Sequence, residues 1–352
     1  MGSGTWDSST YTINASTRAA KGQSTFHYSS QVRSGAVVAK AHDLLDPLTK
    51  AGDASPFAGK VMREVTISDE HPNPTPIAIV LDVTGSNIDA ARAVHAKLPQ
   101  LFGLLQRKGY VEDPQILIAA TGDAYSDTVP LQVGQFESDN RIDAMVEAMY
   151  LEGNGGGQRM ETYELAAYYL ARHTHLEPWH KQGRKGYAIF IGDENFYPTL
   201  QRDFSKGGRG FYSSNHTVAS LTGDTLEADI DSKEIWEELK EQYEPFFLFQ
   251  RQGAYQEKDI LPQWREVLGE NAVTLEDPNT VCEFIAGLLA MREGGLDIDD
   301  LADDLKDAGF DPAAIANVGK TLALVGGGGS GGAVAKTDGS LGLDDSTGTD
   351  RL

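Results

Sequence analysis

The sequence predicts an α/β fold in which helices cover both faces of a mostly parallel central sheet. From Pro76 onward, short aliphatic runs alternate with longer amphipathic segments at intervals of roughly 30 residues. Acidic or hydroxyl side chains directly follow several of these runs. Alternating strands and helices favour parallel pairing, and such a sheet binds ligands beyond the carboxyl ends of its strands.

Five apolar runs predict the strands. The first three have the length and apolar continuity of strands that are buried on both faces, and the last two are shorter versions of the same pattern. The runs are IAIVLD (77–82), QILIAATGD (115–123), YAIFIGDE (187–194), PFFLFQ (245–250) and AVTLED (272–277). With helices between them, these strands would form a Rossmann-like sheet.

Amphipathic segments between the runs predict the helices. They lie at 88–107, 141–150, 161–173, 233–243 and 279–291. In the first segment, apolar residues from Ile88 to Leu105 recur three and four positions apart and form one stripe. Pro99 lies inside that pattern, so we expect it to kink the helix or divide it.

Shifts in composition divide the chain into four parts. Residues 1–73 are rich in Ser, Thr, Ala and Gly and are expected to form an extension that wraps or precedes the main domain, which spans 74–295. Residues 296–325 are expected to form a short helical segment. The tail at 326–352 begins with GGGGSGG and is expected to be flexible, Gly-rich and acidic.

The overall charge limits the classes of partner. The net charge of −22 disfavours nucleic acid and anionic membrane surfaces, because both would be repelled. Cationic partners and divalent metals are better matched. The single cysteine, Cys282, lies in an apolar run and is expected to be a buried thiol. With neither a signal peptide nor a membrane span in the sequence, we expect a cytoplasmic protein.

Asp82, Thr84 and Ser86 follow the first aliphatic run. An aspartate at the end of a buried strand, with hydroxyls two and four residues later in a turn, can direct three oxygens to one point. Mg²⁺ prefers such hard oxygen ligands. The simpler alternative is that Asp82 caps the next helix while the hydroxyls satisfy backbone donors.

Two later loops favour the metal interpretation. A glycine-rich loop, Gly155 to Gln158, precedes a helix, and a second buried strand ends in Gly192-Asp193. With Asp82-Val83-Thr84-Gly85-Ser86 and the Gly122-Asp123 segment, this pattern resembles the von Willebrand factor A (VWA) family. Members of that family carry a metal-ion-dependent adhesion site in three loops.

The resemblance implies a VWA fold and a non-enzymatic, metal-dependent protein-binding module. Its metal ligands would be Asp82, Thr84, Ser86, Gln158 and Asp193. The ion would be Mg²⁺, or another divalent cation such as Mn²⁺ or Ca²⁺. Gln158 stands where the family has a carboxylate, which implies a weaker site. The partner would be a protein, such as an AAA+ ATPase of the MoxR type or a multiprotein assembly.

Two other functions remain open. The chain could be a structural or assembly component with a degenerate metal site. Alternatively, the motif at Asp82 resembles the phosphorylation motif of P-type ATPases and haloacid dehalogenases, in which the aspartate is the nucleophile of a phosphotransferase. Val83 replaces the lysine of that motif, and Tyr197 stands where a second aspartate is expected.

Two further clusters have simpler interpretations. His173, His175 and His180 could suggest zinc, but their spacing lacks a cysteine or an i, i+4 pair, and we expect them to end a helix. The acidic stretch 298–307 has apolar residues at helical spacing and is expected to be a solvated helix.

Overall fold

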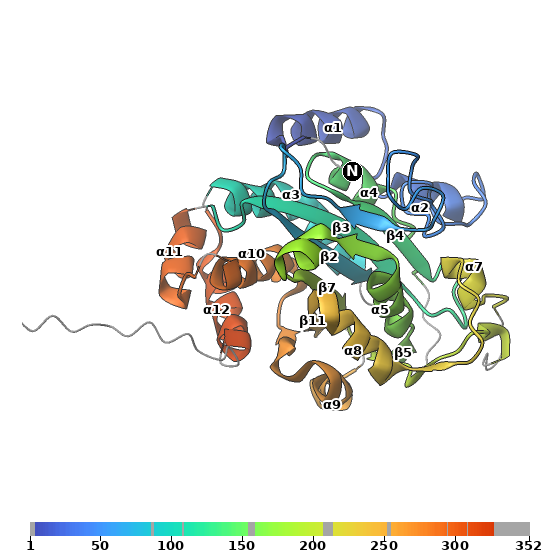
Figure 1. Ribbon diagram of the computed structural model, residues 1–352. Helices are drawn as coiled ribbons and strands as arrows, with labels where there is room; N and C mark the ends of the chain where they lie inside the picture. Colours follow the sequence, from blue (N-terminus) through green and yellow to red (C-terminus); the bar gives the residue numbers. More distant parts are fainter. Residues whose placement is uncertain are drawn as a thin grey trace, which may run out of the picture.

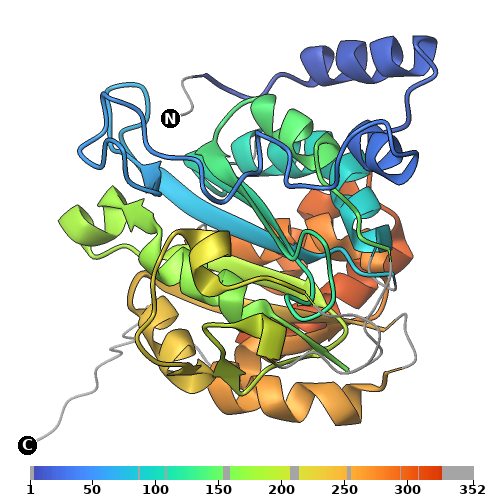
Figure 2. The ribbon, with the colours of Figure 1, turned by 90° about the vertical axis from the view of Figure 1, so that its right-hand side faces the viewer.

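A computed structural model shows a six-stranded central sheet flanked by helices (Figures 1 and 2). The structure describes residues 4–85, 88–107, 109–153, 159–206, 214–251, 255–293, 295–307 and 309–326. The strand order is β12-β11-β7-β2-β3-β4. The strands are β2 (Pro74–Asp82), β3 (Asp113–Thr121), β4 (Leu131–Glu137), β7 (Gly186–Gly192), β11 (Tyr243–Gln250) and β12 (Ala272–Leu275). The predicted mixed α/β class is therefore confirmed, and each predicted aliphatic run coincides with a strand.

All neighbouring pairs in this sheet are parallel except β3 and β4. The antiparallel edge strand β4 was not predicted, because its sequence LQVGQFE contains a glycine and two glutamines. Gln132 is nevertheless fully buried, since its amide exchanges hydrogen bonds of 2.8 Å with the backbone N–H and carbonyl of Tyr150. This pairing makes a polar residue acceptable in a buried strand.

Side chains of β2 alternate between two hydrophobic cores. Ile77, Ile79 and Leu81 belong to one core, and Ala78 and Val80 belong to the other. The first core includes α3 (Ile88–Arg107), α4 (Arg141–Glu147) and α10 (Val281–Glu293), and the second includes α5 (Tyr163–Arg172), α8 (Ser232–Gln242) and α9 (Glu257–Leu268). Helices thus cover both faces, and the period of two in the strand determines which face each residue reaches.

Helix α3 continues as one element through Pro99, so of the two outcomes expected for Pro99, a kink or a division, the division does not occur. Helix α9 was missed by the sequence patterns because Pro262 lies inside it. The apolar helix α10 was predicted correctly. Its Cys282 is buried with a free thiol, as expected.

Shorter elements connect the main ones. They are β1 (Arg63–Val65), β5 (Met160–Glu161), β6 (Thr174–Leu176), β8 (Asn195–Phe196), β9 (Thr199–Leu200), β10 (Ile230–Asp231), α6 (Glu177–Gln182) and α7 (Val218–Thr222). Parallel pairing of β5 with β8 places the start of α5 beside the segment that follows β7. This pairing matters for the site described below.

The amino-terminal segment packs against the sheet domain. It contains α1 (Ser8–Ala20) and α2 (His27–Arg33), which lie beside α3 and α4 in Figure 1. The Trp6 ring stacks on Phe102 of α3 with centroids 4.7 Å apart. The guanidinium of Arg63 is buried and donates to the carbonyls of Asp46, Thr49 and Gly134.

At the other end of the chain, α11 (Ile298–Asp307) and α12 (Pro312–Gly326) pack beside α10 (Figure 1). Leu301 and Leu322 reach Gly287 of α10 so closely that a Cβ there would lie 2.8 Å and 2.6 Å from them. The segment 298–307 is a helix, as expected, with Leu301 and Leu305 buried against its neighbours and acidic residues such as Asp299, Asp300 and Asp303 exposed on its outer face. Residues 327–352 lie outside the described residues.

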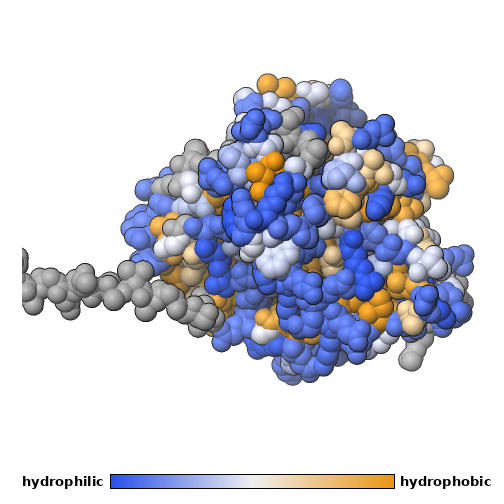
Figure 3. Space-filling model, viewed as in Figure 1, coloured by the Kyte–Doolittle hydropathy of each residue, from blue (hydrophilic) through white to orange (hydrophobic). Residues whose placement is uncertain are grey.

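The face of the molecule seen in Figure 3 is mostly hydrophilic. On the face seen in Figure 3, apolar residues form small separate clusters among hydrophilic ones. Within the described residues, no helix combines the length and the apolar character needed to cross a membrane.

Candidate metal centre

Asp82 and Asp193 lie at the centre of the carboxyl edge of the sheet. Strand β2 pairs with β3 on one side and β7 on the other, so the strand order reverses at β2. Asp82 ends β2, and Asp193 follows β7 immediately. In open α/β sheets, ligands bind in the crevice at such a reversal. The topology therefore brings together two of the residues predicted from the sequence.

Both carboxylate oxygens of Asp82 accept hydrogen bonds. Oδ1 accepts from the Thr84 backbone N–H at 2.8 Å and from the Thr84 hydroxyl at 2.6 Å, and Oδ2 accepts from the Tyr163 hydroxyl at 2.6 Å. Asp82, Thr84 and Tyr163 are all buried. The Thr84 hydroxyl thus orients the carboxylate and keeps oxygen lone pairs for a further contact.

A glycine at the end of β7 makes the Tyr163 contact possible. A Cβ at Gly192 would lie 1.9 Å from the Tyr163 hydroxyl oxygen. Any side chain at this position would push the phenol away from Asp82. The close approach, rather than a special backbone angle, explains the glycine.

The buried carboxylates around this point form a larger cluster than the sequence suggested. All are at most 6% exposed. They are Asp82, Asp123, Asp127, Glu161, Glu164, Asp193 and Glu194. Buried carboxylates are expected to be paired, protonated or bound to a cation, because an isolated buried charge is costly.

Mutual repulsion in the cluster raises several pKa values. Burial and the nearby charge of Asp193 raise the pKa of Asp82 to about 6, although the Thr84 and Tyr163 hydrogen bonds oppose the rise. Burial and the charges of Asp82 and Asp193 raise the pKa of Glu194 to about 8. A divalent cation would favour the charged forms of both groups.

Glu161 is a member of the cluster whose surroundings suit a cation. Burial, followed by the charge of Asp82, raises its pKa well above the usual value. Among the described residues, Oε2 of Glu161 receives no hydrogen bond. A buried carboxylate oxygen without a donor is expected to face a cation or a proton.

The sequence patterns assigned no ligand role to Glu161 or Glu194. Glu161 lies in β5, whose pairing with β8 brings it beside the segment that follows β7. The available signals were a carboxylate three residues after the glycine-rich loop and a second acidic residue directly after Asp193. Two-residue strands are too short to be predicted from periodicity, so this convergence is visible only in the structure.

Two of the predicted ligands, Ser86 and Gln158, lie outside the described residues. Nearby, Gly153 donates from its backbone N–H to the Val83 carbonyl at 3.4 Å. A Cβ on Gly85 would lie 3.1 Å from the Gly153 carbonyl oxygen. The described ends of the first and second loops therefore meet.

The three histidines considered for zinc do not converge. His173 is the C-cap of α5, and its ring nitrogens lie 3.1 Å from the Val61 carbonyl and 2.9 Å from Asp224. His175 and His180 stack on each other with centroids 4.3 Å apart. Both ring nitrogens of His173 thus have partners. Among the described residues, neither His175 nor His180 belongs to a group of side chains that could hold a metal ion.

Comparisons with known proteins assign no family to the chain. No family model and no curated protein matches it. Among solved structures, the pilus adhesin SpaC from Lactobacillus rhamnosus GG in its open conformation is similar over 66% of this chain and 31% of that chain, with 12% identity and a TM-score of 0.44.

Two further structures are more distant. Proximal thread matrix protein 1 from the mussel byssus matches 62% of this chain and 47% of that chain, with 8% identity and a TM-score of 0.38. The type V pili tip protein Mfa5 from Porphyromonas gingivalis matches 58% and 47%, with 12% identity and a TM-score of 0.34. This chain spans less than half of each matched structure, and similarities at this level carry no conclusion about function.

The assignment to the VWA family was wrong. No model of that family or any other matches the chain, and the similar structures are adhesin and thread matrix proteins at 8–12% identity. The physical reason is that the motifs were short. Aspartates, hydroxyls and glycines at the carboxyl edge satisfy the demands of any parallel sheet with polar loops, so their order does not specify a family.

Proposed function

We propose that the chain is a non-enzymatic protein-binding module whose binding depends on a divalent cation at the carboxyl edge of the sheet. The observation that carries this proposal is the buried Glu161 carboxylate in the cluster that contains Asp82, whose Oε2 receives no hydrogen bond from the part of the chain that the structure describes. Residues from four separated segments contribute carboxylates to this cluster. Such convergence is typical of a binding site rather than of packing.

The donor chemistry of these residues supports a hard divalent cation, whose binding would draw their oxygens together, since among the described residues the cluster holds no group of three acidic ligand atoms within 4.8 Å of one another. Asp82, Glu161, Asp193 and Glu194 would supply carboxylate oxygens, and Thr84 a hydroxyl oxygen. The cluster contains oxygen donors from acidic residues and lacks sulfur, which suits Mg²⁺ and also Mn²⁺ or Ca²⁺. The cation would reduce the repulsion among these groups and attract an oxygen ligand from a partner.

Binding is favoured over phosphotransfer at Asp82. A nucleophilic aspartate needs an accessible oxygen, whereas Asp82 is fully buried and its two oxygens accept from Thr84 and Tyr163. Val83, in the place of the expected lysine, is also buried in the core. These contacts suit a carboxylate that is held in position rather than one that attacks a substrate.

The partner is proposed by its chemistry. A carboxylate-bearing segment of another protein would complete the coordination of the cation and would otherwise be repelled by a chain of net charge −22. Binding of the partner would then depend strongly on the concentration of the cation. The expectation of a MoxR-type AAA+ ATPase depended on the family resemblance alone, and the contacts described here add no support to it.

Two finer predictions belong to this proposal. The reversal of strand order at β2 supports a Rossmann-like, doubly wound arrangement of the sheet. The cytoplasmic location stays a prediction from the sequence.

The proposal is tested by cation binding to the intact chain. Thermal unfolding is measured with and without Mg²⁺, Mn²⁺ or Ca²⁺ for the wild type, Asp82→Asn and the exposed control Asp89→Asn. Cation at about 100 times its Kd should stabilise the wild type by roughly 2.7 kcal/mol. We expect the control to behave like the wild type and Asp82→Asn to lose most of the effect.

Partner binding is tested next, with an array of Asp- and Glu-containing peptides and matched amide peptides. Retention of acidic peptides that requires cation and is lost in Asp82→Asn supports the module. Cation binding without any peptide preference would favour the alternative, a structural or assembly component. If none of the three cations stabilises the wild type, the metal site itself is overturned.

A further inference from the structure

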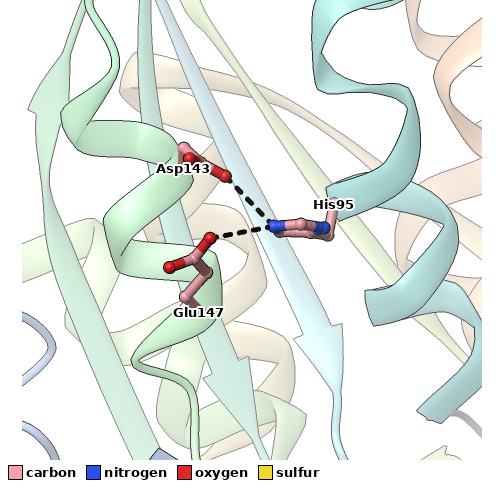
Figure 4. A group of neighbouring side chains, drawn as sticks. All are labelled: His95, Asp143 and Glu147. Atoms are coloured by element: carbon pink, nitrogen blue, oxygen red, sulfur yellow. Dashed lines mark hydrogen bonds and ion pairs between the residues drawn. The ribbon is translucent and has the colours of Figure 1, made fainter. Parts of the chain in front are cut away.

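A second group of potential ligands lies between α3 and α4, away from the carboxyl edge. His95 of α3 faces Asp143 and Glu147, which are four residues apart on α4 (Figure 4). We propose that His95, Asp143 and Glu147 form a binding site for a divalent transition metal such as Zn²⁺, in competition with the guanidinium of Arg18. This site is independent of the proposed function.

The distances suit a small tetrahedral ion. Nε2 of His95 lies 3.0 Å from Asp143 Oδ1 and 3.3 Å from Glu147 Oε1. Ligands at about 2.0–2.1 Å from Zn²⁺ are about 3.3 Å from each other in a tetrahedron. One atom from each of the three residues lies within 4.8 Å of the others. Small side-chain movements would therefore place all three around one ion.

The hydrogen bonding of the group is incomplete. One imidazole N–H cannot serve two carboxylates equally, and His95 Nε2 is hydrogen bonded to Glu147 Oε1. Asp143 is 1% exposed, and its Oδ1 receives no hydrogen bond from the described residues. A buried oxygen that points at an imidazole nitrogen without a hydrogen bond is a potential metal ligand.

Arg18 of α1 is the present counter-charge. Its Nη1 lies 3.5 Å from Asp143 Oδ2 and also forms an ion pair with Glu147 Oε1. Helix α1 has no buried residues of its own, so its hold on the domain rests on contacts such as this one. A metal that replaced Arg18 would keep the two carboxylates neutralised.

A cavity of about 460 Å³ opens beside the imidazole and gives the ion a route from solvent. His95, Phe26, Arg33 and Arg92 are among its lining residues. Water in this cavity could supply the fourth ligand of a tetrahedral site. The ligand set contains an imidazole, unlike the all-oxygen cluster around Asp82, so it should prefer Zn²⁺ or Co²⁺ to Mg²⁺.

A proton on His95 is the competing occupant. Burial lowers the pKa of His95, but its contacts with the Asp143 and Glu147 carboxylates and the charges of both groups outweigh burial and raise it. A protonated His95 with Arg18 would form a purely ionic network. The experiment below distinguishes this network from a metal site.

The test uses the full chain, with Mg²⁺ in excess to saturate the hard-oxygen cluster. Zn²⁺ is titrated by calorimetry, and Co²⁺ by the visible absorption of a nitrogen-ligated ion. The variants are His95→Ala, Glu147→Gln and Arg18→Ala, with the exposed His180→Ala as a matched histidine control. Glu147→Gln preserves side-chain volume and therefore serves if His95→Ala does not fold.

One equivalent of metal is expected in the wild type and in His180→Ala. His95→Ala and Glu147→Gln should weaken binding by about 10- to 100-fold or more. Arg18→Ala should tighten binding, because it removes the competitor. The proposal is overturned if the wild type and the ligand variants bind metal equally. It is also overturned if neither the wild type nor Arg18→Ala binds metal, because the group is then only an ionic network. Weaker binding in Arg18→Ala would overturn the competition.

Discussion

The Tyr163 hydroxyl donates a 2.6 Å hydrogen bond to Asp82 Oδ2 across the carboxyl edge of the sheet. Both groups are completely buried, so no water can replace the phenol. We predict that Tyr163→Phe lowers the free energy of unfolding by about 1–3 kcal/mol without added cation, because Asp82 Oδ2 loses a buried hydrogen bond. Chemical denaturation measures this loss. Unchanged stability would show that Asp82 is protonated or otherwise satisfied.

Gly192 lies under the same phenol. Gly192→Ala should destabilise the protein by about 1–3 kcal/mol or more, because the new methyl group would lie 1.9 Å from the Tyr163 oxygen. Gly52→Ala is the control, since a Cβ there meets nothing within 4 Å. Thermal unfolding of the two variants makes the comparison. Similar stabilities would mean that the Tyr163 side chain moves aside easily.

Glu161→Gln should have opposite effects with and without cation. A raised pKa lowers stability at neutral pH, because the unfolded state ionises more readily than the folded state. The amide removes this loss, so without a divalent ion we expect higher stability than in the wild type. With Mg²⁺, the wild type should gain stability and the variant should gain much less. Thermal unfolding in both conditions tests this crossover. Glu234→Gln, at an exposed position on α8, should shift neither value.

Asp127 should make stability depend on pH. Burial and the charges of Glu152 and Asp123 raise its pKa to about 7, although hydrogen bonds oppose the rise. The unfolded state ionises near the ordinary value of 3.8, so stability contributed by the protonated group falls as pH rises from about 4 to 7. Each pKa unit corresponds to about 1.4 kcal/mol.

We therefore predict that Asp127→Asn flattens the loss of stability between pH 5 and pH 7, as measured by urea unfolding at closely spaced pH values. In the wild type, Asp127 Oδ2 accepts a 2.8 Å hydrogen bond from the Asp123 backbone N–H. The amide oxygen of the asparagine variant can still accept this hydrogen bond. An equal slope in the variant and the wild type would contradict the raised pKa of Asp127.

The sequence was most informative where burial is complete. Runs such as 77–82 are apolar because both faces of the strand are covered, and this continuity is visible without a structure. Strand β4 was missed because the burial of Gln132 depends on its bonds to Tyr150, a distant partner. Helix α1 was missed because it buries no residue and so carries no apolar stripe.

The candidate metal centre was predictable in part. Asp82 and Asp193 follow strands that the sequence reveals, so their meeting at the carboxyl edge could be expected. The position of Glu161 depends on the pairing of β5 with β8, and that of His95 opposite Asp143 depends on the packing of α3 against α4. Tertiary contacts of this kind leave no periodic signal.

The contacts of Arg63 have a consequence for the solubility of the protein. Strand β4 ends the sheet, and an uncovered outer strand invites pairing with another molecule. Here the Arg63 side chain donates a hydrogen bond to the Gly134 carbonyl of β4. The Val133 backbone N–H of the same strand donates to the Leu45 carbonyl at 2.8 Å. The amino-terminal segment thus shields the edge of the sheet from self-association. A chain shortened to begin at residue 74 would leave the Gly134 carbonyl and the Val133 N–H of β4 without these partners and open to pairing with another strand.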